Sequence, residues 1–202
     1  MEGISELIAR LKDAGVPLDD RIEDAMNSVD PRCFTDHNLE PFLGDRPVPF
    51  LVTEGGAAKT ISAPHMVATL LHHLEIREGQ HVLLLGSKGG YLAALLDCML
   101  GPDGIVTIIE PHDEVLLHTS ERLEMFDSMG FLTVLPSEAL EDWNGLSRRV
   151  DRVLVTGSVR ILPPDIEALV EDGGFVPVLS AGQCTRGFSS ARSRVTSGLI
   201  RT

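Results

Sequence analysis

Residues 81–100 read HVLLLGSKGGYLAALLDCML, and this stretch decides the fold class. An apolar run of strand length (81–85) is followed by a glycine-rich turn (86–90) and by an apolar stretch of helix length (91–100). More short runs rich in Val, Ile and Leu follow, separated by stretches long enough for helices. Strands that alternate with helices indicate βαβ units and a parallel sheet covered on both faces. The sequence therefore predicts an α/β fold with a doubly wound, mostly parallel sheet.

The apolar runs and the stretches between them give the bounds of the expected strands and helices. Strands are predicted at 81–85, 105–110, 131–135, 152–156 and 174–179, and helices at 91–100, 112–129 and 164–172. Upstream, apolar residues at helical spacing predict helices near 5–15 and 20–27, and a third over 62–76 with Ser62 as its N-cap. The segment 30–56 is rich in Pro and Gly, which predicts a loop covering the rest. The chain thus divides into an N-terminal helical and loop region (1–76) and an α/β core (77–202), packed as one compact unit.

Composition and charge restrict the classes of function. Hydrophobic residues make up 43% of the 202 residues and charged residues 23%, which is typical of a soluble globular domain. The net charge of −13 disfavours a nucleic-acid partner. The apolar runs are far shorter than the roughly 20 residues of a membrane helix, and the N-terminus lacks the apolar core of a signal peptide, so we expect a cytoplasmic protein. Cys33, Cys98 and Cys184 are far apart and without metal-ligand spacing, so neither a disulfide nor a metal site is expected.

The glycine-rich turn and the acid that ends the following strand form a first candidate site. Glycines between a buried strand and a helix permit a tight turn and a close approach of a ligand to the backbone. Glu110 follows Gly90 by 20 residues, and a carboxylate at that place can accept hydrogen bonds from both hydroxyls of a ribose. The pair favours a nucleoside-binding site. The alternative is a packing turn with a solvated Glu110.

A second candidate is KTISAPHM, residues 59–66, immediately before a predicted helix. It offers two hydroxyls, an imidazole and the free N–H groups of a helix start, an arrangement that suits a carboxylate. The alternative is an ordinary helix cap.

Residues 42–68, which include this second candidate site, resemble a known family. TISAPHMVA (60–68), preceded by FLGDRPVPFLVTEGGAAK (42–59), resembles the signature of protein-L-isoaspartate O-methyltransferases, which are S-adenosylmethionine-dependent protein repair enzymes. The similarity continues upstream in LKDAGVPLDDRIEDAMNSVDPRCF and downstream in VLLLGSKGGYLAALL, VTIIE and VDRVLVTGSVRILPPDIEALVEDGGFVPVLSAG. It covers roughly residues 5–182 in one register. The resemblance implies a class I methyltransferase fold, which is Rossmann-like, with an N-terminal helical addition.

The resemblance also implies roles for single residues. Ser62 matches the residue usually assigned as the active site, and Thr60 supplies a second hydroxyl on the substrate side. The implied cofactor-binding residues are Gly86, Ser87, Gly90, Tyr91, Glu110 and Glu138, the last as the closest counterpart of the family's Asp near the adenine. The implied cofactor is S-adenosylmethionine, the implied partners are isoaspartyl-containing proteins or peptides, and the methyl acceptor is the α-carboxylate of the isoaspartyl residue. No metal or general base is needed, since a carboxylate is already nucleophilic.

The chain departs from the family pattern within the cofactor turn. Leu84 stands where the family keeps an acid that helps to hold the cofactor's ammonium group, and Lys88 replaces the middle glycine. Lys59 replaces a glutamine. A lysine brings positive charge beside a ligand that carries an ammonium and a sulfonium. Lys88 is therefore expected to limit cofactor affinity; the alternatives are a solvated side chain and a site for a different, anionic ligand.

These departures keep a second function open. The alternative to a methyltransferase is a non-catalytic or altered-ligand homologue that acts as a binding or scaffold protein. A methyltransferase with another substrate, including RNA, is a third possibility, against which the acidic charge counts. Only 20 residues follow Gly182, fewer than the family's final hairpin needs. A shortened C-terminal edge is therefore expected, with RVTSGLI (194–200) supplying one terminal strand and the edge available for self-association.

Overall fold

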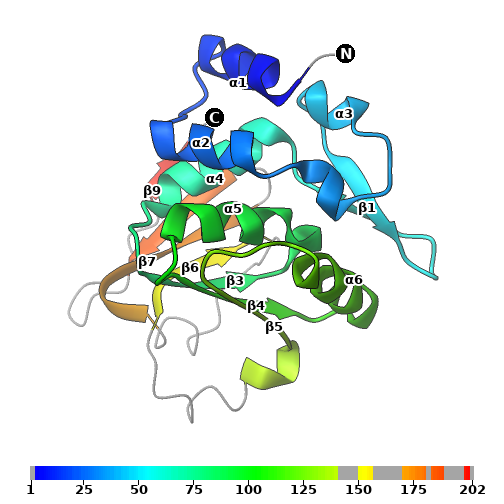
Figure 1. Cartoon of the computed structure of the whole chain (residues 1–202). Helices are drawn as coiled ribbons and strands as arrows, with labels where there is room; N and C mark the ends of the chain where they lie inside the picture. Colours follow the sequence, from blue (N-terminus) through cyan, green and yellow to red (C-terminus); the bar gives the residue numbers. More distant parts are fainter. Residues whose placement is uncertain (1–2, 141–149, 157–169, 181–182, 189–197, 201–202) are drawn as a thin grey trace.

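The computed structural model describes residues 3–140, 150–156, 170–180, 183–188 and 198–200, and of the last three ranges only the strands. A seven-stranded sheet lies at its centre (Figure 1). Its strands are β3 (His81–Leu85), β4 (Ile105–Glu110), β5 (Phe131–Pro136), β6 (Val150–Val155), β7 (Val170–Ser180), β8 (Gln183–Phe188) and β9 (Gly198–Ile200). They follow the order β5-β4-β3-β6-β7-β8-β9, in which the first five are parallel and β8 and β9 are antiparallel. The predicted α/β fold with a mostly parallel sheet is confirmed.

The C-terminal edge differs in one respect from the expectation. Two antiparallel strands follow β7, whereas the sequence predicts a single one. The predicted terminal strand over 194–200 includes β9, and residues 194–197 lie outside the described residues. The predicted C-terminal end of the helix over 164–172 is wrong, because residues 170–172 belong to β7. The rest of that helix lies outside the described residues.

The helices that follow β3 and β4 cover one face of the sheet (Figure 1). α5 (Tyr91–Leu100) has the predicted bounds, whereas α6 (Asp113–Glu124) is five residues shorter than predicted at its C-terminal end. The cause is Asp97 on α5, whose carboxylate accepts hydrogen bonds from the backbone N–H groups of Met129 (2.7 Å) and Gly130 (2.9 Å). These bonds hold the chain in the conformation that leads into β5 rather than in a helix.

The N-terminal region contains more regular structure than its composition predicts. Its helices are α1 (Ile4–Asp13), α2 (Asp20–Ser28), the short 3-10 helix η1 (Pro31–Phe34), α3 (Glu40–Leu43) and α4 (Pro64–Leu74), and its strands β1 (Val48–Val52) and β2 (Ala58–Ile61) form an antiparallel hairpin. The prediction of a loop over 30–56 is therefore wrong for η1, α3 and β1. Proline is tolerated in β1 because a two-stranded hairpin leaves half of its backbone N–H groups unpaired.

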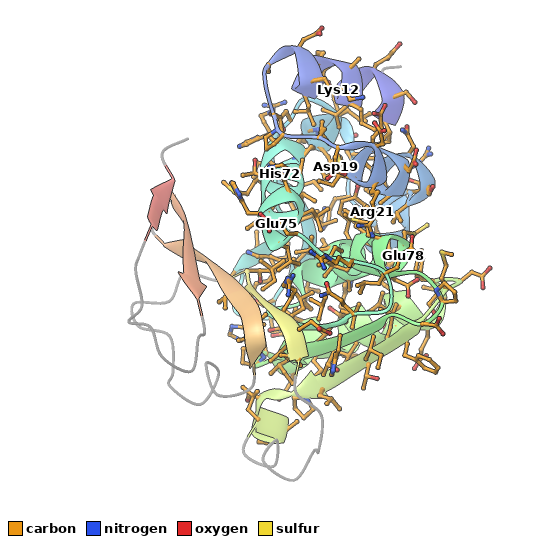
Figure 2. All side chains as sticks on the ribbon, turned by 90° about the vertical axis from the view of Figure 1, so that its left-hand side faces the viewer. Lys12, Asp19, Arg21, His72, Glu75 and Glu78 are labelled. Carbon is orange, nitrogen blue, oxygen red and sulfur yellow. The ribbon has the colours of Figure 1, made fainter. Side chains whose placement is uncertain are left out.

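Polar contacts attach the N-terminal helices to the core. Asp19 caps α2 by accepting a hydrogen bond from the N–H of Ile22 at 2.9 Å. Arg21, the second residue of the same helix (Figure 2), donates to the carbonyl oxygens of Ile76 (2.8 Å) and Met99. These carbonyls lie at or just beyond the ends of α4 and α5, so one guanidinium joins α2 to both helices.

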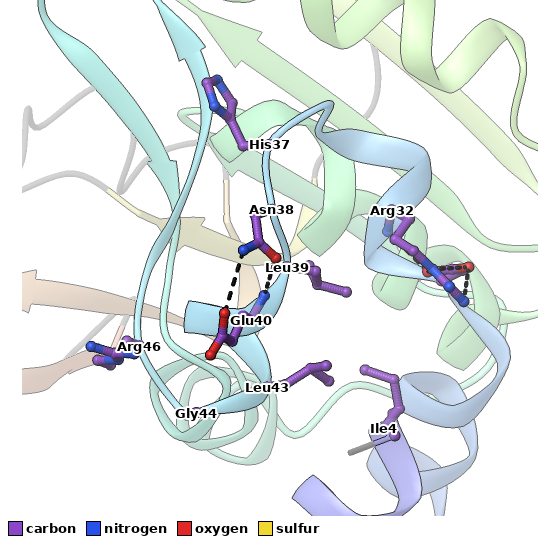
Figure 3. A pocket seen from close by; sticks show the side chains of 11 residues that line it. Ile4, Arg32, His37, Asn38, Leu39, Glu40, Leu43, Gly44 and Arg46 are labelled. Atoms are coloured by element: carbon purple, nitrogen blue, oxygen red, sulfur yellow. Dashed lines mark hydrogen bonds and ion pairs between the residues drawn. The ribbon is translucent and has the colours of Figure 1, made fainter. Parts of the chain in front are cut away.

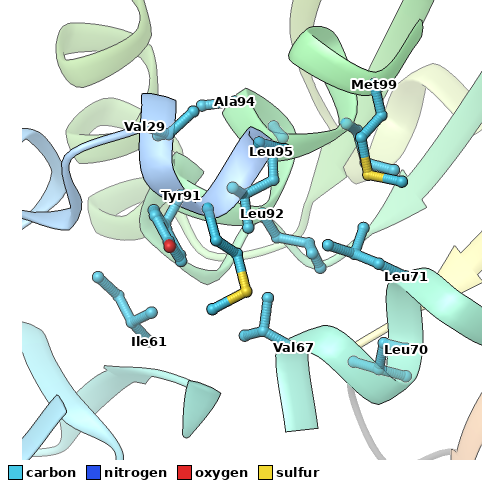
Figure 4. Close-up of a cluster of buried hydrophobic side chains, with 14 of the residues drawn as sticks. Val29, Ile61, Val67, Leu70, Leu71, Tyr91, Leu92, Ala94, Leu95 and Met99 are labelled. Atoms are coloured by element: carbon cyan, nitrogen blue, oxygen red, sulfur yellow. The ribbon is translucent and has the colours of Figure 1, made fainter. Parts of the chain in front are cut away.

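One hydrophobic cluster extends from the first helix to the sheet. It includes Leu7 on α1, Leu71 on α4, Leu95 on α5 and Leu154 on β6. Figure 4 shows the part of this cluster where α4 faces α5. The N-terminal region and the α/β part therefore share a core. Within the described residues, none of the helices combines the length and the apolar character that a membrane crossing requires.

Tyr91, the first residue of α5, lies at the centre of this core. Its ring is fully buried and packs edge-on against Phe42 and Phe34, with centroid distances of 5.5 and 5.9 Å. Its hydroxyl has no hydrogen-bond partner within the described part of the chain. Burial raises the pKa of Tyr91 far above its usual range. An unpaired hydroxyl in this position costs stability, because it has lost its bonds to water.

We therefore expect the Tyr91→Phe variant to be more stable than the wild type by about 1 kcal/mol, since the ring contacts are kept and the unpaired hydroxyl is removed. Urea unfolding would measure the difference. Phe34→Ala serves as the control for ring packing and should lose about 3–5 kcal/mol. A Tyr91→Phe variant that is less stable than the wild type would show that the hydroxyl has a partner.

Candidate functional site

The strand order places a switch point between β3 and β6. The chain leaves β3 toward β4 on one side, and β6 pairs with the other side of β3. In open parallel sheets, ligands bind outside the carboxyl ends of the strands at such a point. Gly86 directly follows β3 and Thr156 directly follows β6. The predicted glycine-rich turn is therefore located where this fold binds ligands.

Gly86 and Thr156 depend on each other. The Thr156 hydroxyl lies within hydrogen-bond distance of two carbonyl oxygens to which it can donate, those of Leu85 (3.0 Å) and Gly86 (2.8 Å). Gly86 has a φ of +89°, and a Cβ atom at this position would lie 2.5 Å from the Thr156 hydroxyl oxygen. Only glycine satisfies both conditions. The ends of the two central strands are thus joined tightly beside the candidate site.

Glu110, at the end of β4, holds the turn from the other side. Its Oε2 atom accepts hydrogen bonds from the N–H (2.8 Å) and the hydroxyl (2.9 Å) of Ser87, and its Oε1 atom accepts one from the N–H of His112 (3.1 Å). The hydroxyl of Thr119 on α6 donates in turn to the Ser87 hydroxyl at 2.7 Å. Ser87 is fully buried and Glu110 is only 5% exposed. The alternative of a solvated Glu110 is therefore wrong.

These contacts limit what Glu110 can offer a ligand. A carboxylate accepts about four hydrogen bonds, and three are already used by its own chain. One acceptor position remains, on Oε1. A ribose could donate one hydroxyl there. To accept the second one, Glu110 would have to lose the bond from the Ser87 hydroxyl. Ribose binding by Glu110 stays a prediction, with this constraint added.

The remaining glycines of the turn accommodate aromatic rings. Residues 88–90 form a short 3-10 helix, η2, in which Gly89 and Gly90 have φ values of +77° and +98°. A Cβ atom on Gly89 would lie 2.7 Å from the Phe50 ring, and one on Gly90 would lie 3.1 Å from the Phe34 ring. The sequence predicts that glycines here leave space for a ligand, but Phe50 and Phe34 fill the space beside Gly89 and Gly90. The Tyr91 ring is buried in the core, so only its backbone could contact a cofactor.

Lys88 has a backbone conformation that is unfavourable for residues other than glycine. Its φ of +50° lies in the left-handed region, where a residue other than glycine costs about 1–2 kcal/mol. Its side chain is partly buried. Burial lowers the pKa of Lys88, the charge of Glu110 raises it and the charge of Lys59 lowers it further, with a net decrease. Leu84, where the family pattern has an acid, is fully buried and offers a ligand no acceptor.

The second predicted block lies against the first. β2 carries Thr60 and packs against η2, and Ser62 follows β2 directly. The side chains of Thr60 and Ser62 are half-buried. Neither hydroxyl takes part in a hydrogen bond with any residue that the structure describes. The two sequence blocks therefore come together through the packing of β2 against η2, and Ser62 directly follows the strand that makes this contact.

The start of α4 is capped by a residue that the sequence analysis missed. Ser62 makes no capping bond, and the N-cap is Ala63. Asp45 instead accepts a hydrogen bond from the N–H of His65 at 2.9 Å and pairs with the His65 ring, also at 2.9 Å. The carboxylate of Asp45 thus occupies this helix N-terminus. The sequence alone also allowed a substrate carboxylate to bind there. Both the backbone N–H and the ring of His65 are therefore engaged by Asp45.

Glu138 lies farther from the turn. It belongs to the 3-10 helix η3 (Ser137–Leu140), which follows β5 at the same edge of the sheet. Its side chain is exposed, and one oxygen is 3.3 Å from the Ser137 hydroxyl. It therefore stays a prediction for the adenine end of a ligand.

A cavity of about 900 Å³ opens elsewhere in the N-terminal region (Figure 3). Residues of α1, η1 and α3 and of the segments beside them line it, among them Ile4, Arg32, His37 and Arg46. None of its lining residues belongs to the glycine-rich turn or to residues 59–66. It is separate from the candidate site.

Comparisons with known proteins agree on one family. Residues 2–192 match the family model described as protein-L-isoaspartate(D-aspartate) O-methyltransferase. A protein-L-isoaspartate O-methyltransferase of Methanothrix thermoacetophila is 32% identical over 169 residues, which is 81% of this chain and 76% of that protein.

Two solved structures share the fold at 19% sequence identity. One is a protein-L-isoaspartate O-methyltransferase with a TM-score of 0.80; the match covers 98% of this chain but only 63% of that one. The other is a Plasmodium falciparum protein of the same family in complex with S-adenosyl-L-homocysteine, with a TM-score of 0.79 and coverage of 99% and 95%. The class I methyltransferase fold is thus confirmed.

The contacts of Glu110 generate a prediction about stability. Glu110→Ala should destabilise the fold by about 2–3 kcal/mol, because the two buried donors of Ser87 and the N–H of His112 lose their acceptor. Glu138→Ala removes an exposed carboxylate from the same edge of the sheet and should change stability by less than about 0.5 kcal/mol. Thermal and urea unfolding of both variants would test this. Equal stabilities for the two variants would contradict the proposed bonding of Glu110.

Proposed function

Because the chain belongs to the protein-L-isoaspartate O-methyltransferase family, we propose that it transfers a methyl group from S-adenosylmethionine to the α-carboxylate of isoaspartyl residues in proteins or peptides. The observation that carries this proposal is the placement of Thr60 and Ser62. β2 carries Thr60, directly precedes Ser62 and packs against η2 of the glycine-rich turn, and neither hydroxyl is hydrogen-bonded to a residue that the structure describes. A hydroxyl pair at such a place can donate hydrogen bonds to a carboxylate and fix its orientation.

The residues of the site fit a nucleoside cofactor in part. Glu110 keeps one acceptor position, and the turn at Gly86 follows the central strand. When bound, S-adenosylmethionine supplies an electrophilic methyl group. The chain itself has to align and desolvate the substrate carboxylate, which is a nucleophile without losing a proton. Thr60 and Ser62 are therefore positioning donors rather than nucleophiles.

Leu84 and Lys88 favour a second candidate, a homologue that binds a ligand or a protein without transferring a methyl group. Leu84 provides no acceptor for an ammonium group, and Lys88 adds a positive charge. This alternative predicts no turnover and is separated from the first by the experiment below.

The setting of the reaction belongs to the proposal as well. The net charge of −13 supports protein or peptide substrates over nucleic acid. Cys33 and Cys98 are free thiols, which supports a cytoplasmic location. β9 is the outermost strand of the described sheet beyond β8, and its outer edge is available for pairing with a second copy of the chain.

The test is methyl transfer from labelled S-adenosylmethionine to a synthetic peptide with one isoaspartyl residue, compared with the same peptide containing aspartate. We expect base-labile methyl ester only on the isoaspartyl peptide. Ser62→Ala and Thr60→Val should lower kcat/KM at least tenfold with little change in stability, since neither hydroxyl is bonded to the described residues. Thr133→Val, on the exposed strand β5, is the matched control.

Two results would contradict the proposal. Binding of S-adenosylhomocysteine without any transfer would support the non-catalytic alternative. Full activity of both hydroxyl variants would show that Thr60 and Ser62 do not hold the substrate.

A further inference from the structure

Two of the chain's three lysines lie at the candidate site. Lys12 is on α1, whereas Lys59 is on β2 and Lys88 is on η2, which packs against β2. The two lysines therefore lie on elements that contact each other, and the charge of Lys59 contributes to the lowered pKa of Lys88, after the larger effect of burial. In a chain with a net charge of −13, this pair is a local concentration of positive charge.

The fold does not neutralise this pair. Within the part of the chain that the structure describes, neither lysine forms an ion pair, whereas Lys12 pairs with Glu23. Glu110 attracts Lys88, but its oxygens accept hydrogen bonds from Ser87 and His112. Two neighbouring cations without a carboxylate partner leave their donors available to a ligand.

The backbone at Lys88 adds an independent observation. A lysine is held at a φ of +50°, partly buried and beside a like charge, at a position where the family pattern has glycine. Strained residues of this kind concentrate at sites of function, where the strain is retained for a purpose. Each of these features is unfavourable in the free protein, and a bound anion would offset the repulsion and the burial.

We propose that Lys59 and Lys88 bind a carboxylate of the reacting ligands. This inference rests on the proposed function, which provides two such groups: the amino-acid carboxylate of S-adenosylmethionine and the α-carboxylate of the isoaspartyl residue. Ammonium donors form charge-assisted hydrogen bonds with a carboxylate, and the hydroxyls of Thr60 and Ser62 lie next to Lys59 in the chain. The two lysines would supply positive charge for a ligand carboxylate in a site where Leu84 replaces the acid of the family pattern.

The test uses charge-removing variants of the full chain, Lys59→Met and Lys88→Met, with Lys12→Met as the matched control of equal charge change. Lys59→Arg and Lys88→Arg keep the charge. Calorimetry would measure binding of S-adenosylhomocysteine, which carries the amino-acid carboxylate, and of 5′-methylthioadenosine, which lacks it. Methyl-transfer assays would give KM and kcat for the isoaspartyl peptide. Thermal unfolding would confirm that each variant is folded.

Two results support the proposal and identify the source of the carboxylate. If the cofactor provides it, both Met variants should bind S-adenosylhomocysteine at least fivefold more weakly, with methylthioadenosine unchanged. If the substrate provides it, S-adenosylhomocysteine affinity should be unchanged and the KM for the peptide should rise at least fivefold at similar kcat. In both cases the Arg variants should retain most of the wild-type affinity.

Other results overturn it. Met variants that behave like Lys12→Met, or that bind S-adenosylhomocysteine more tightly, would show that the lysines bind no carboxylate. If the wild type transfers no methyl group yet its S-adenosylhomocysteine affinity depends on both lysines, the proposed function fails and the carboxylate site stands. If transfer proceeds and no lysine matters, the reverse holds. A wild type that neither binds S-adenosylhomocysteine nor transfers a methyl group would overturn both.

Discussion

The hydrogen bonds to the buried carboxylate of Glu110 are the interaction on which the site depends. They attach the turn after β3 to the end of β4 through Ser87, and the Thr119 hydroxyl extends the network to α6. On the other side, Thr156 joins the same turn to β6. The backbone of the turn is thus bonded to both neighbouring strands. A buried charge requires such partners, because an unpaired carboxylate in the interior is costly.

This arrangement determines how the N-terminal region meets the sheet. With the turn held in place, its left-handed glycines present flat backbone, and Phe50 and Phe34 pack directly onto it. Phe50 belongs to β1, so this contact positions the hairpin that carries Lys59 and Thr60. Packing between segments far apart in the sequence thus brings β2, which carries Lys59 and Thr60, against the turn that carries Lys88.

The sequence predicts the parts of the fold that are encoded locally. The buried strands β3, β4 and β6 are rich in Val, Ile and Leu, and α5 follows from the apolar stretch after Gly90, so pattern alone identifies them. The hairpin strand β1 was missed because Pro47 and Pro49 are typical of loops. The end of α6 was missed because Asp97, a distant residue, determines it.

The candidate site shows the same division between local and long-range information. The need for glycine at 86, 89 and 90 and for an acid at 110 is visible in the sequence, but the groups that approach them are not. Ser87, Thr119 and Phe50 contact these positions only after folding, and nothing in the spacing indicates that a ring rather than a ligand lies on Gly89. Asp45, which caps α4, lies 20 residues before His65, and its φ of +57° is not visible in the sequence.

A crystal structure of the chain with S-adenosylhomocysteine would test the central claim most directly, namely that the switch-point turn held by Glu110 forms the ligand site together with residues 59–62. The account predicts the nucleoside against the turn at residues 86–90, with one ribose hydroxyl bonded to Oε1 of Glu110 and the bond from the Ser87 amide retained. A ligand bound in the cavity beside Arg32 and His37, or a ribose remote from Glu110, would contradict it.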